Sequence, residues 1–337
     1  MSTTNAALVQ LEKQGPQTVS STVFAVPAIT DDEVLVRIDS AGLNPVDWKI
    51  TKYGVFVDTF PTVLGSDGAG VVTQVGQAVG SHKVGDRVFF QGQIGNVKTS
   101  TFQQFAAVKA TLAAHLPDNT TFEQGATLGV AGITSAVGLF TTLGFAAPWV
   151  AGATEANKGK QVLIWGGSTS VGHLAVQLAS LAGLTVIVTA SPQYHATLKT
   201  LGATHTVDYR APDVVDQIKA ITKGTLTHAY DTTGPGSQPS FDSLSITEPS
   251  ILAVINAADH VLNQAAFSNR KIVSLLGSSY ANMELAVPFW KYVTQVLESG
   301  KLVPQATKVI GGLDVIVAAQ KDQMDGKVSS VKLIAKP

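Results

Sequence analysis

Short runs of alternating polar and apolar residues, separated by glycine-rich turns, occupy the first third of the chain. Residues Glu33 to Ile38 alternate as the two faces of a half-buried strand do. The glycine-dense stretch from Gly65 to Gly80 carries valines between its glycines, which favours a strand with tight bends over a helix. The pattern predicts a mostly β module over residues 1–125.

A different pattern begins near Phe122. Residues Ala126 to Thr142 combine small side chains with Leu and Val, as a closely packed helix does. From Gln161 onward, short apolar strands alternate with helical stretches. The expected strands are Gln161–Trp165, Thr185–Thr189, His205–Asp208, Thr227–Asp231 and Ser250–Ile255, and the expected helices are His173–Ala182, Gln193–Leu201 and Val214–Thr222.

That order of elements is typical of a doubly wound parallel sheet. We therefore predict an α/β protein in which a Rossmann-type domain, residues 126–275, is inserted into a mostly β domain, residues 1–125 and 276–337. The last part of the chain adds a predicted helix, Val287 to Glu298, and a strand, Ser330 to Ile334.

Composition narrows the class of protein. Charged residues make up only 14% of the chain and the net charge is −1, so no basic excess is available for nucleic acid. No apolar run is expected to span a bilayer, and the N-terminus lacks the features of a signal peptide, so a cytoplasmic protein is expected. The chain has no cysteine, which excludes disulfides and thiolate ligands, and its histidines do not form local pairs, so no metal site is predicted.

The strongest local signal for chemistry is the turn between the strand at Gln161–Trp165 and the helix that follows. A dinucleotide fold needs glycine there because the turn is sharp, the backbone approaches the pyrophosphate, and the helix lies close to the strand. The strict GxGxxG pattern is broken by Thr169, but the strand–turn–helix setting is intact, and the hydroxyls of Ser168, Thr169 and Ser170 are expected to bond the pyrophosphate. A plain βαβ unit without a ligand is the alternative. The predicted cofactor contacts are Gly166, Gly167, Ser168, Thr169, Ser170, Val171 and Gly172.

The end of the next strand indicates which cofactor binds. Folds specific for NAD carry an acid about twenty residues after the turn, which binds the ribose 2′-hydroxyl. Here Ala190 and Ser191 stand at that point, and Ser191 is able to donate to a 2′-phosphate. NADPH is therefore predicted over NADH. Lys199 is either part of this site or a solvated lysine on a helix face.

Several segments together resemble one family, the zinc-free medium-chain dehydrogenase/reductases, which include quinone reductases and enoyl reductases. The segments are EVLVRIDSAGLNPVDWK (33–49), LGSDGAGVVTQVG (64–76), VGDRV (84–88), GATLGVAGITSAVGL (125–139) and VLIWGGSTSVGHLAVQLA (162–179). The stretch from Thr189 to Asp213 is similar to that of fungal trans-acting enoyl reductases. The resemblance implies that the mostly β domain is GroES-like and catalytic.

The resemblance also implies further cofactor contacts. Near the nicotinamide it implies Val46, Asp47, Trp48 and Lys49, and at the 2′-phosphate it implies Ser191, Pro192, Gln193, Tyr194 and Tyr209. Around the acyl or nicotinamide pocket and at the chain's end it implies Thr134, Asn256, Leu275, Gly277, Lys327 and Val328.

Zinc-dependent relatives carry Cys before the Asp of the first turn and Gly-His-Glu in the second segment, whereas this chain has Leu43 and Ser66 at the ligand positions. Without that Lewis acid, reduction of an activated carbon–carbon double bond or a quinone is the expected reaction. Tyr53 and Lys49 are the candidate catalytic residues, with solvent as an alternative proton source. Lys49 is expected to hold either the substrate carbonyl or the cofactor ribose.

A small-molecule substrate is expected, with no nucleic-acid or membrane partner. The oligomeric state stays open between a monomer and a homodimer. The alternatives to a reductase are an NADPH-binding protein with little turnover, in a structural or partner role, and, less favoured, a zinc alcohol dehydrogenase.

Overall fold

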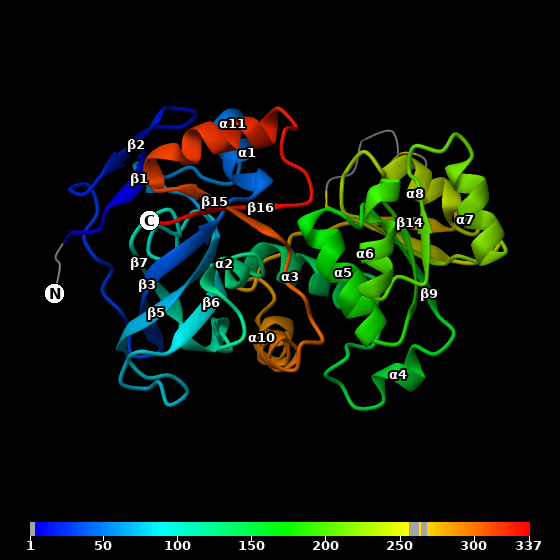
Figure 1. Ribbon diagram of the computed structural model, residues 1–337, viewed down its shortest axis with the longest axis horizontal. Helices are drawn as coiled ribbons and strands as arrows, with labels where there is room; N and C mark the ends of the chain where they lie inside the picture. The colour runs from blue at the N-terminus through cyan, green and yellow to red at the C-terminus, as the bar shows by residue number, and fades with distance from the viewer. Residues whose placement is uncertain (1–3, 256–262, 264–267) are drawn as a thin grey trace. The chain divides into compact units, whose positions relative to one another are not determined.

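A computed structural model of the chain describes residues 4–255, 263 and 268–337. Contacts divide it into two compact units: one comprises Met1–Val130 and Ser278–Pro337, the other Ala131–Gly277. The domain limits expected above lay at 125/126 and 275/276. Figure 1 labels the helices and strands of both units and colours the chain from blue at the N-terminus to red at the C-terminus.

The second unit is built on one parallel sheet, because its apolar runs alternate with helices. Within the described residues, six parallel strands stand in the order β11-β10-β9-β12-β13-β14. The strands are β9 Gln161–Trp165, β10 Thr185–Thr189, β11 His205–Val207, β12 His228–Asp231, β13 Ser250–Val254 and β14 Arg270–Ser274. The helices are α4 Ala153–Ala156, α5 Ser170–Leu181, α6 His195–Thr200, α7 Val214–Thr222 and α8 Ser237–Ser243, with 3-10 turn η3 Pro192–Tyr194.

This strand order confirms the predicted Rossmann-type fold, since in sequence numbering it reads 3-2-1-4-5-6. On one face of the sheet, Leu163 and Ile187 pack with Ile218 of α7 and Phe241 of α8 in a single buried cluster. Helix α5 packs on β9 and β10. The strand order reverses between β9 and β12, and ligands of such sheets bind outside the carboxyl ends of the strands at that point.

The first unit is mostly β, as predicted, with two sheets. Among its described residues, three antiparallel strands form one sheet in the order β2-β1-β4, and seven form the other, in the order β15-β16-β3-β5-β6-β8 with β7 paired to β3. The strands are β1 Ala7–Gln10, β2 Gln17–Ser20, β3 Glu33–Gly42, β4 Thr62–Val63, β5 Asp67–Val75, β6 Arg87–Gln91, β7 Phe105–Lys109, β8 Ala113–His115, β15 Thr307–Gly311 and β16 Lys332–Ala335.

Four α-helices of this unit are described, and the sequence pattern predicted only one of them, α10. They are α1 Pro45–Tyr53, α2 Phe122–Gly125, α10 Met283–Glu298 and α11 Ile316–Met324, with 3-10 turns η1 Ala110–Leu112 and η4 Leu313–Val315. The Asn-Pro turn of the sequence is the start of α1: Asn44 is its N-cap and Pro45 its first residue. Helix α10 begins four residues before the expected Val287.

One helical stretch differs from the expectation that no apolar run could span a membrane. Phe122–Thr142 is long and apolar enough by length and composition alone, and it comprises α2, α3 Gly129–Ala136 and the π-helical η2 Val137–Thr142. However, 78% of its most apolar window is buried within the fold, which is the burial of a core helix.

Candidate functional site

The turn that follows β9 lies at the point where the strand order of the parallel sheet reverses. Gly166 and Gly167 leave β9 and donate their amides to the carbonyl of Thr189, at the end of β10, over 3.2 and 2.9 Å. On the other side, the amide of Thr232, just after β12, donates to the carbonyl of Trp165 over 3.1 Å. The turn is thus held between the carboxyl ends of both neighbouring strands.

Two of the predicted glycines are required by the backbone of this turn. Gly166 has φ +89°, and a Cβ built on it would lie 2.3 Å from the Cγ2 of Thr233. A Cβ on Gly172 would lie 2.2 Å from the carbonyl oxygen of Gly166. Helix α5 therefore begins in direct contact with the turn, as a dinucleotide site requires.

Thr169 stands where the strict pattern has its middle glycine, and its side chain caps helix α5. Its Oγ1 accepts the amide of Gly172 over 2.9 Å and lies 2.9 Å from the Oγ1 of Thr232. The Thr169 hydroxyl therefore has two partners within the fold, and its contact with a pyrophosphate stays a prediction. Ser168 and Ser170 are half-buried on either side of it, and the carbonyl of Val171 accepts the Ser135 hydroxyl over 2.8 Å.

The residues predicted to bind the 2′-phosphate follow the ends of β10 and β11. Thr189 and Val207 are paired across these parallel strands, so Ser191 and Tyr209 each lie two residues past the same edge of the sheet. Ser191 is 8% exposed and makes no capping bond to η3, which contains Pro192, Gln193 and Tyr194. The structure therefore brings Ser191, Tyr209 and the turn after β9 to one edge.

Three further predicted contacts of this unit, Thr134, Leu275 and Gly277, lie outside the turn after β9. Gly277 lies directly against Thr134, since a Cβ built on Gly277 would lie 1.9 Å from the Thr134 Oγ1. The buried Thr134 accepts the Tyr230 hydroxyl at its carbonyl over 2.8 Å, and Leu275 extends β14 through a bond from its amide to Val254. The predicted contact Asn256 lies outside the described residues.

In the first unit, helix α1 carries the predicted nicotinamide contacts and both candidate catalytic residues. Val46, Trp48 and Lys49 are half-buried, and Lys49 Nζ lies 5.8 Å from the centroid of the Trp48 indole. Tyr53 ends the helix, 56% exposed, with its ring centroid 6.0 Å from that of Trp48. The two catalytic candidates, Lys49 and Tyr53, thus lie on one helix and both lie beside the Trp48 ring.

The start of α1 is fixed by a buried ionic cluster. Lys332 Nζ of β16 lies 2.8 Å from Asp67 Oδ2 of β5, and it also donates to the side-chain carbonyl of Asn44. Asn44 Nδ2 in turn donates to Asp67 over 2.9 Å. Lys332 was not among the predicted site residues; a lysine inside an apolar strand was the only signal for it.

Asp47 lies beside this cluster and is fully buried. Its Oδ2 accepts the amide of Asn44 over 2.7 Å, while its Oδ1 has no hydrogen-bond partner among the described residues. Burial raises the pKa of Asp47 from 3.8 to about 7, although the Asn44 amide and the Lys332 charge favour the carboxylate.

The predicted contacts at the chain's end follow helix α11. Lys327 is 60% exposed in its side chain and is paired with Asp322 and Asp325 over 3.1 and 3.2 Å. Val328 packs against the hydrophobic core of the same unit. Among the described residues, neither forms an ion pair with Lys332 or Asp67.

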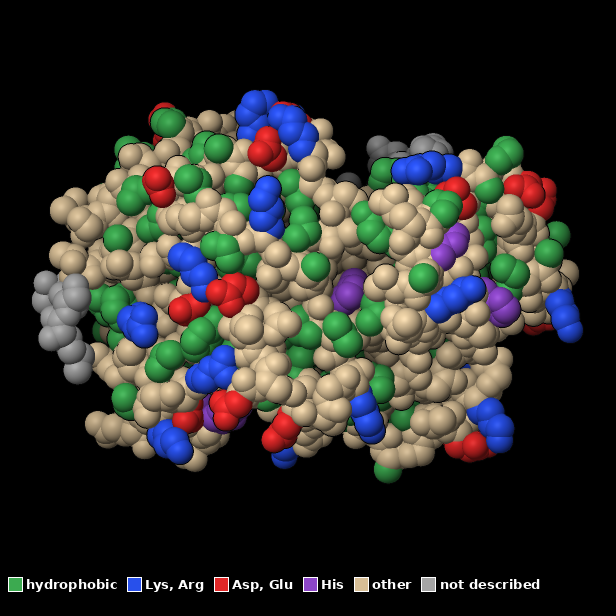
Figure 2. All heavy atoms as spheres, viewed as in Figure 1, with side chains coloured by type: hydrophobic (Ala, Val, Ile, Leu, Met, Phe, Trp, Pro, Cys, Tyr) green, Lys and Arg blue, Asp and Glu red, His purple; other side chains and the backbone are tan. Residues whose placement is uncertain are grey.

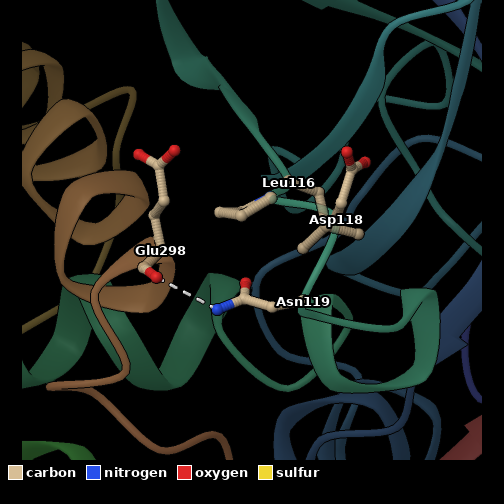
Figure 3. Close-up of a pocket in the computed structure, with 5 residues that line it drawn as sticks. Leu116, Asp118, Asn119 and Glu298 are labelled. Atoms are coloured by element: carbon tan, nitrogen blue, oxygen red, sulfur yellow. Dashed lines mark hydrogen bonds between the residues drawn. The ribbon is translucent and has the colours of Figure 1, made fainter.

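A shallow depression of about 410 Å³ lies elsewhere on the first unit, lined by Leu116, Pro117, Asp118, Asn119 and Glu298. Asn119 Nδ2 donates to the carbonyl of Glu298 across its floor, over 3.1 Å (Figure 3). None of the predicted site residues lines it. On the face drawn in Figure 2, acidic and basic side chains are interspersed, and no extended patch of either sign is seen among the coloured residues.

Comparisons with known proteins agree with the observed fold. Two family models match: the alcohol dehydrogenase GroES-like domain over residues 30–138 and the zinc-binding dehydrogenase over residues 170–289. A trans-enoyl reductase of Alternaria alternata is 33% identical, with 99% of each chain covered. A zinc-type alcohol dehydrogenase-like protein of Schizosaccharomyces pombe is 31% identical, with 92% of this chain and 94% of that one covered. The solved quinone oxidoreductase of Coxiella burnetii is 26% identical, with 99% of each chain covered and a TM-score of 0.78.

Proposed function

The chain belongs to the medium-chain dehydrogenase/reductase family, in its branch of enoyl reductases and quinone reductases, and on that premise we propose that it is an NADPH-dependent, zinc-independent reductase of activated carbon–carbon double bonds or quinones. The observation that carries the proposal is the turn Gly166–Gly172, which joins a positive-φ glycine to a helix start at the switch point of the sheet.

A nicotinamide dinucleotide fits this turn. Glycines at 166 and 172 leave no side chain between the turn and helix α5, whose first amides supply partial positive charge for a pyrophosphate. Ser191 and Tyr209, at the adjoining strand ends, would hold the adenosine side, and no acid at the end of β10 repels a 2′-phosphate there. When bound, the reduced nicotinamide supplies a hydride.

The catalytic zinc of zinc-dependent relatives does not fit the first unit. Leu43 and Ser66 occupy the corresponding ligand positions, and the neighbouring Asp67 already binds the ammonium of Lys332 in the interior. Removing both side chains' charges from water is costly unless they remain paired, so Asp67 is not available to a second cation. We therefore derive no metal-assisted step, and we do not favour an alcohol dehydrogenase.

The residues of α1 are proposed to act on the substrate. The Lys49 ammonium is suited to hold the carbonyl oxygen of an enoyl or enone group, where negative charge develops during reduction. The Tyr53 phenol is suited to deliver the proton that completes the reaction, with solvent as the alternative source. An enoyl thioester, an enone and a quinone all present the required conjugated carbonyl. We further propose a cytoplasmic location and leave the assembly open between a monomer and a homodimer.

The test is an assay of NADPH oxidation with a panel of 2-enoyl thioesters, alkenals and quinones. We expect at least one member to accelerate the oxidation, and metal analysis of the active protein to find no stoichiometric zinc. Tight NADPH binding with no turnover across the panel would instead favour a binding protein in a structural or partner role. Stoichiometric zinc required for activity would revive the alcohol dehydrogenase.

A further inference from the structure

Thr232 follows β12 directly and contacts the turn after β9. Its Oγ1 lies 2.8 Å from the carbonyl oxygen of Trp165, 3.2 Å from that of Gly166 and 2.9 Å from the Oγ1 of Thr169. The side chain is 7% exposed. Thr232 was not among the predicted site residues, because its partners are some sixty residues away in the chain.

The direction of these hydrogen bonds follows from their acceptors. A hydroxyl has one hydrogen, and the two carbonyl oxygens beside Thr232 can only accept. If Thr232 donated to Thr169 instead, its lone pairs would face both carbonyl oxygens with no hydrogen between them. Thr232 therefore donates to a carbonyl, and Thr169 donates to Thr232.

The Thr169 hydroxyl is consequently engaged twice. It donates to Thr232 and accepts the amide of Gly172. The backbone of Thr169, at φ −71° and ψ 161°, is ordinary for any residue, so this position needs no glycine for its conformation. Whether the Thr169 side chain obstructs a bound dinucleotide therefore depends on where that side chain is held.

We infer that Thr232 is a positioning residue of the dinucleotide site, which acts by holding the Thr169 side chain in the turn and so keeps the approach to the turn's backbone clear. The inference rests on the proposed function in one respect, that the turn binds NADPH. It explains how threonine replaces the middle glycine of the pattern at no cost to the site. Asp231 supports the same segment, since its carboxylate accepts the Thr233 and Gly234 amides over 2.8 and 3.1 Å.

The test compares Thr232→Val, which replaces the hydroxyl with a methyl group, with Thr232→Ser, which keeps the hydroxyl. Thr222→Val is the matched control, because Thr222 is also buried in the same unit but donates to the carbonyl of Ile218 within α7. In the cofactor-free proteins, amide hydrogen exchange of segment 166–173 should be faster in Thr232→Val only. Fluorescence titration should show NADPH binding weakened by about fivefold in Thr232→Val, the loss expected for one hydrogen bond, and restored in Thr232→Ser.

A coupled variant makes the test specific to the proposed mechanism. In a Thr169→Gly background there is no side chain to hold, so adding Thr232→Val should leave NADPH binding unchanged. If Thr232→Val binds NADPH as the wild type does, or weakens it equally in both backgrounds, the positioning role is wrong while the proposed function stands. If the wild type binds neither NADPH nor NADH, the proposed function and this role both fall.

Discussion

Lys332 Nζ lies 2.8 Å from Asp67 Oδ2, and both side chains are buried, at 3% and 0% exposure. Asp67 belongs to β5 and Lys332 to β16, the last strand of the chain, which are separated by β3 in the sheet. Asn44 contacts both ions and is the N-cap of α1. One ion pair therefore fixes the helix that carries the candidate catalytic residues.

Replacing Lys332 by Met should destabilise the first unit by about 3–5 kcal/mol, because the Asp67 carboxylate would remain buried without its partner cation. Lys336→Met is the control: Lys336 is 34% exposed and pairs with Asp39 and Glu123 near the surface. Its loss should cost no more than about 1 kcal/mol. Urea denaturation of both variants measures the difference, and equal small losses would contradict the structural importance of the buried pair.

The pH dependence of the free energy of unfolding should report the raised pKa of Asp47. Its pKa is raised to about 7 in the folded chain against 3.8 in the unfolded one, because burial disfavours the carboxylate. Between these values the folded state binds the extra proton, so stability is greatest below pH 4 as far as this group is concerned. It should fall by about 1 kcal/mol per pH unit up to pH 7 and then stay level. Asp47→Asn, which retains an acceptor for the Asn44 amide, should remove that slope in denaturation curves from pH 5 to 8.

Much of the fold follows from local sequence, and the exceptions have physical reasons. The strands β9 and β10 are continuous apolar runs, so their limits were predicted to the residue. Helix α1 was missed because only Asp47 and Ile50 of its residues are buried, which leaves no apolar stripe to detect. The signal that could have identified it was the Asn-Pro pair at its start.

The candidate site also contains residues that local sequence predicts and residues that it does not. The glycines of the turn were predictable because a sharp turn and a close helix both exclude side chains. The partners of Lys332 and Thr232 were not, because each lies far away in sequence and comes into contact only when the sheet forms. For the same reason, the bond between the Thr169 and Thr232 hydroxyls could not be predicted from the local sequence.

Gly166→Ala should abolish NADPH binding. It should also destabilise the second unit by more than the cost of placing alanine at a positive φ. Gly159 offers the comparison, since it also has positive φ, +75°, but a Cβ there would meet nothing within 4 Å. At Gly166 the added Cβ would lie 2.3 Å from Thr233. Thermal denaturation should show about 1 kcal/mol lost in Gly159→Ala and a larger loss in Gly166→Ala. Similar losses in both would mean that Thr233 moves aside easily.

Ser191→Asp should narrow or reverse the preference for NADPH over NADH, because a carboxylate at the end of β10 repels a 2′-phosphate and accepts a ribose hydroxyl. Thr200→Asp adds the same charge on the exposed last turn of α6 and should leave the ratio unchanged. Dissociation constants for both dinucleotides measure the ratio. An unaltered preference in Ser191→Asp would remove Ser191 from the site.

Tyr53→Phe tests the proton donor of the proposed reduction. If the Tyr53 phenol delivers the proton, its removal should lower kcat by about a hundredfold on the best substrate of the panel, while the dissociation constant of NADPH stays as in the wild type. The aromatic contact with Trp48 survives the change, since only the hydroxyl is lost. Tyr292→Phe, on α10 of the same unit, is the control for loss of a phenol elsewhere. An unchanged kcat in Tyr53→Phe would assign the proton to solvent. In a separate variant, Lys49→Met, a lower kcat together with weaker substrate binding would place the substrate carbonyl at Lys49.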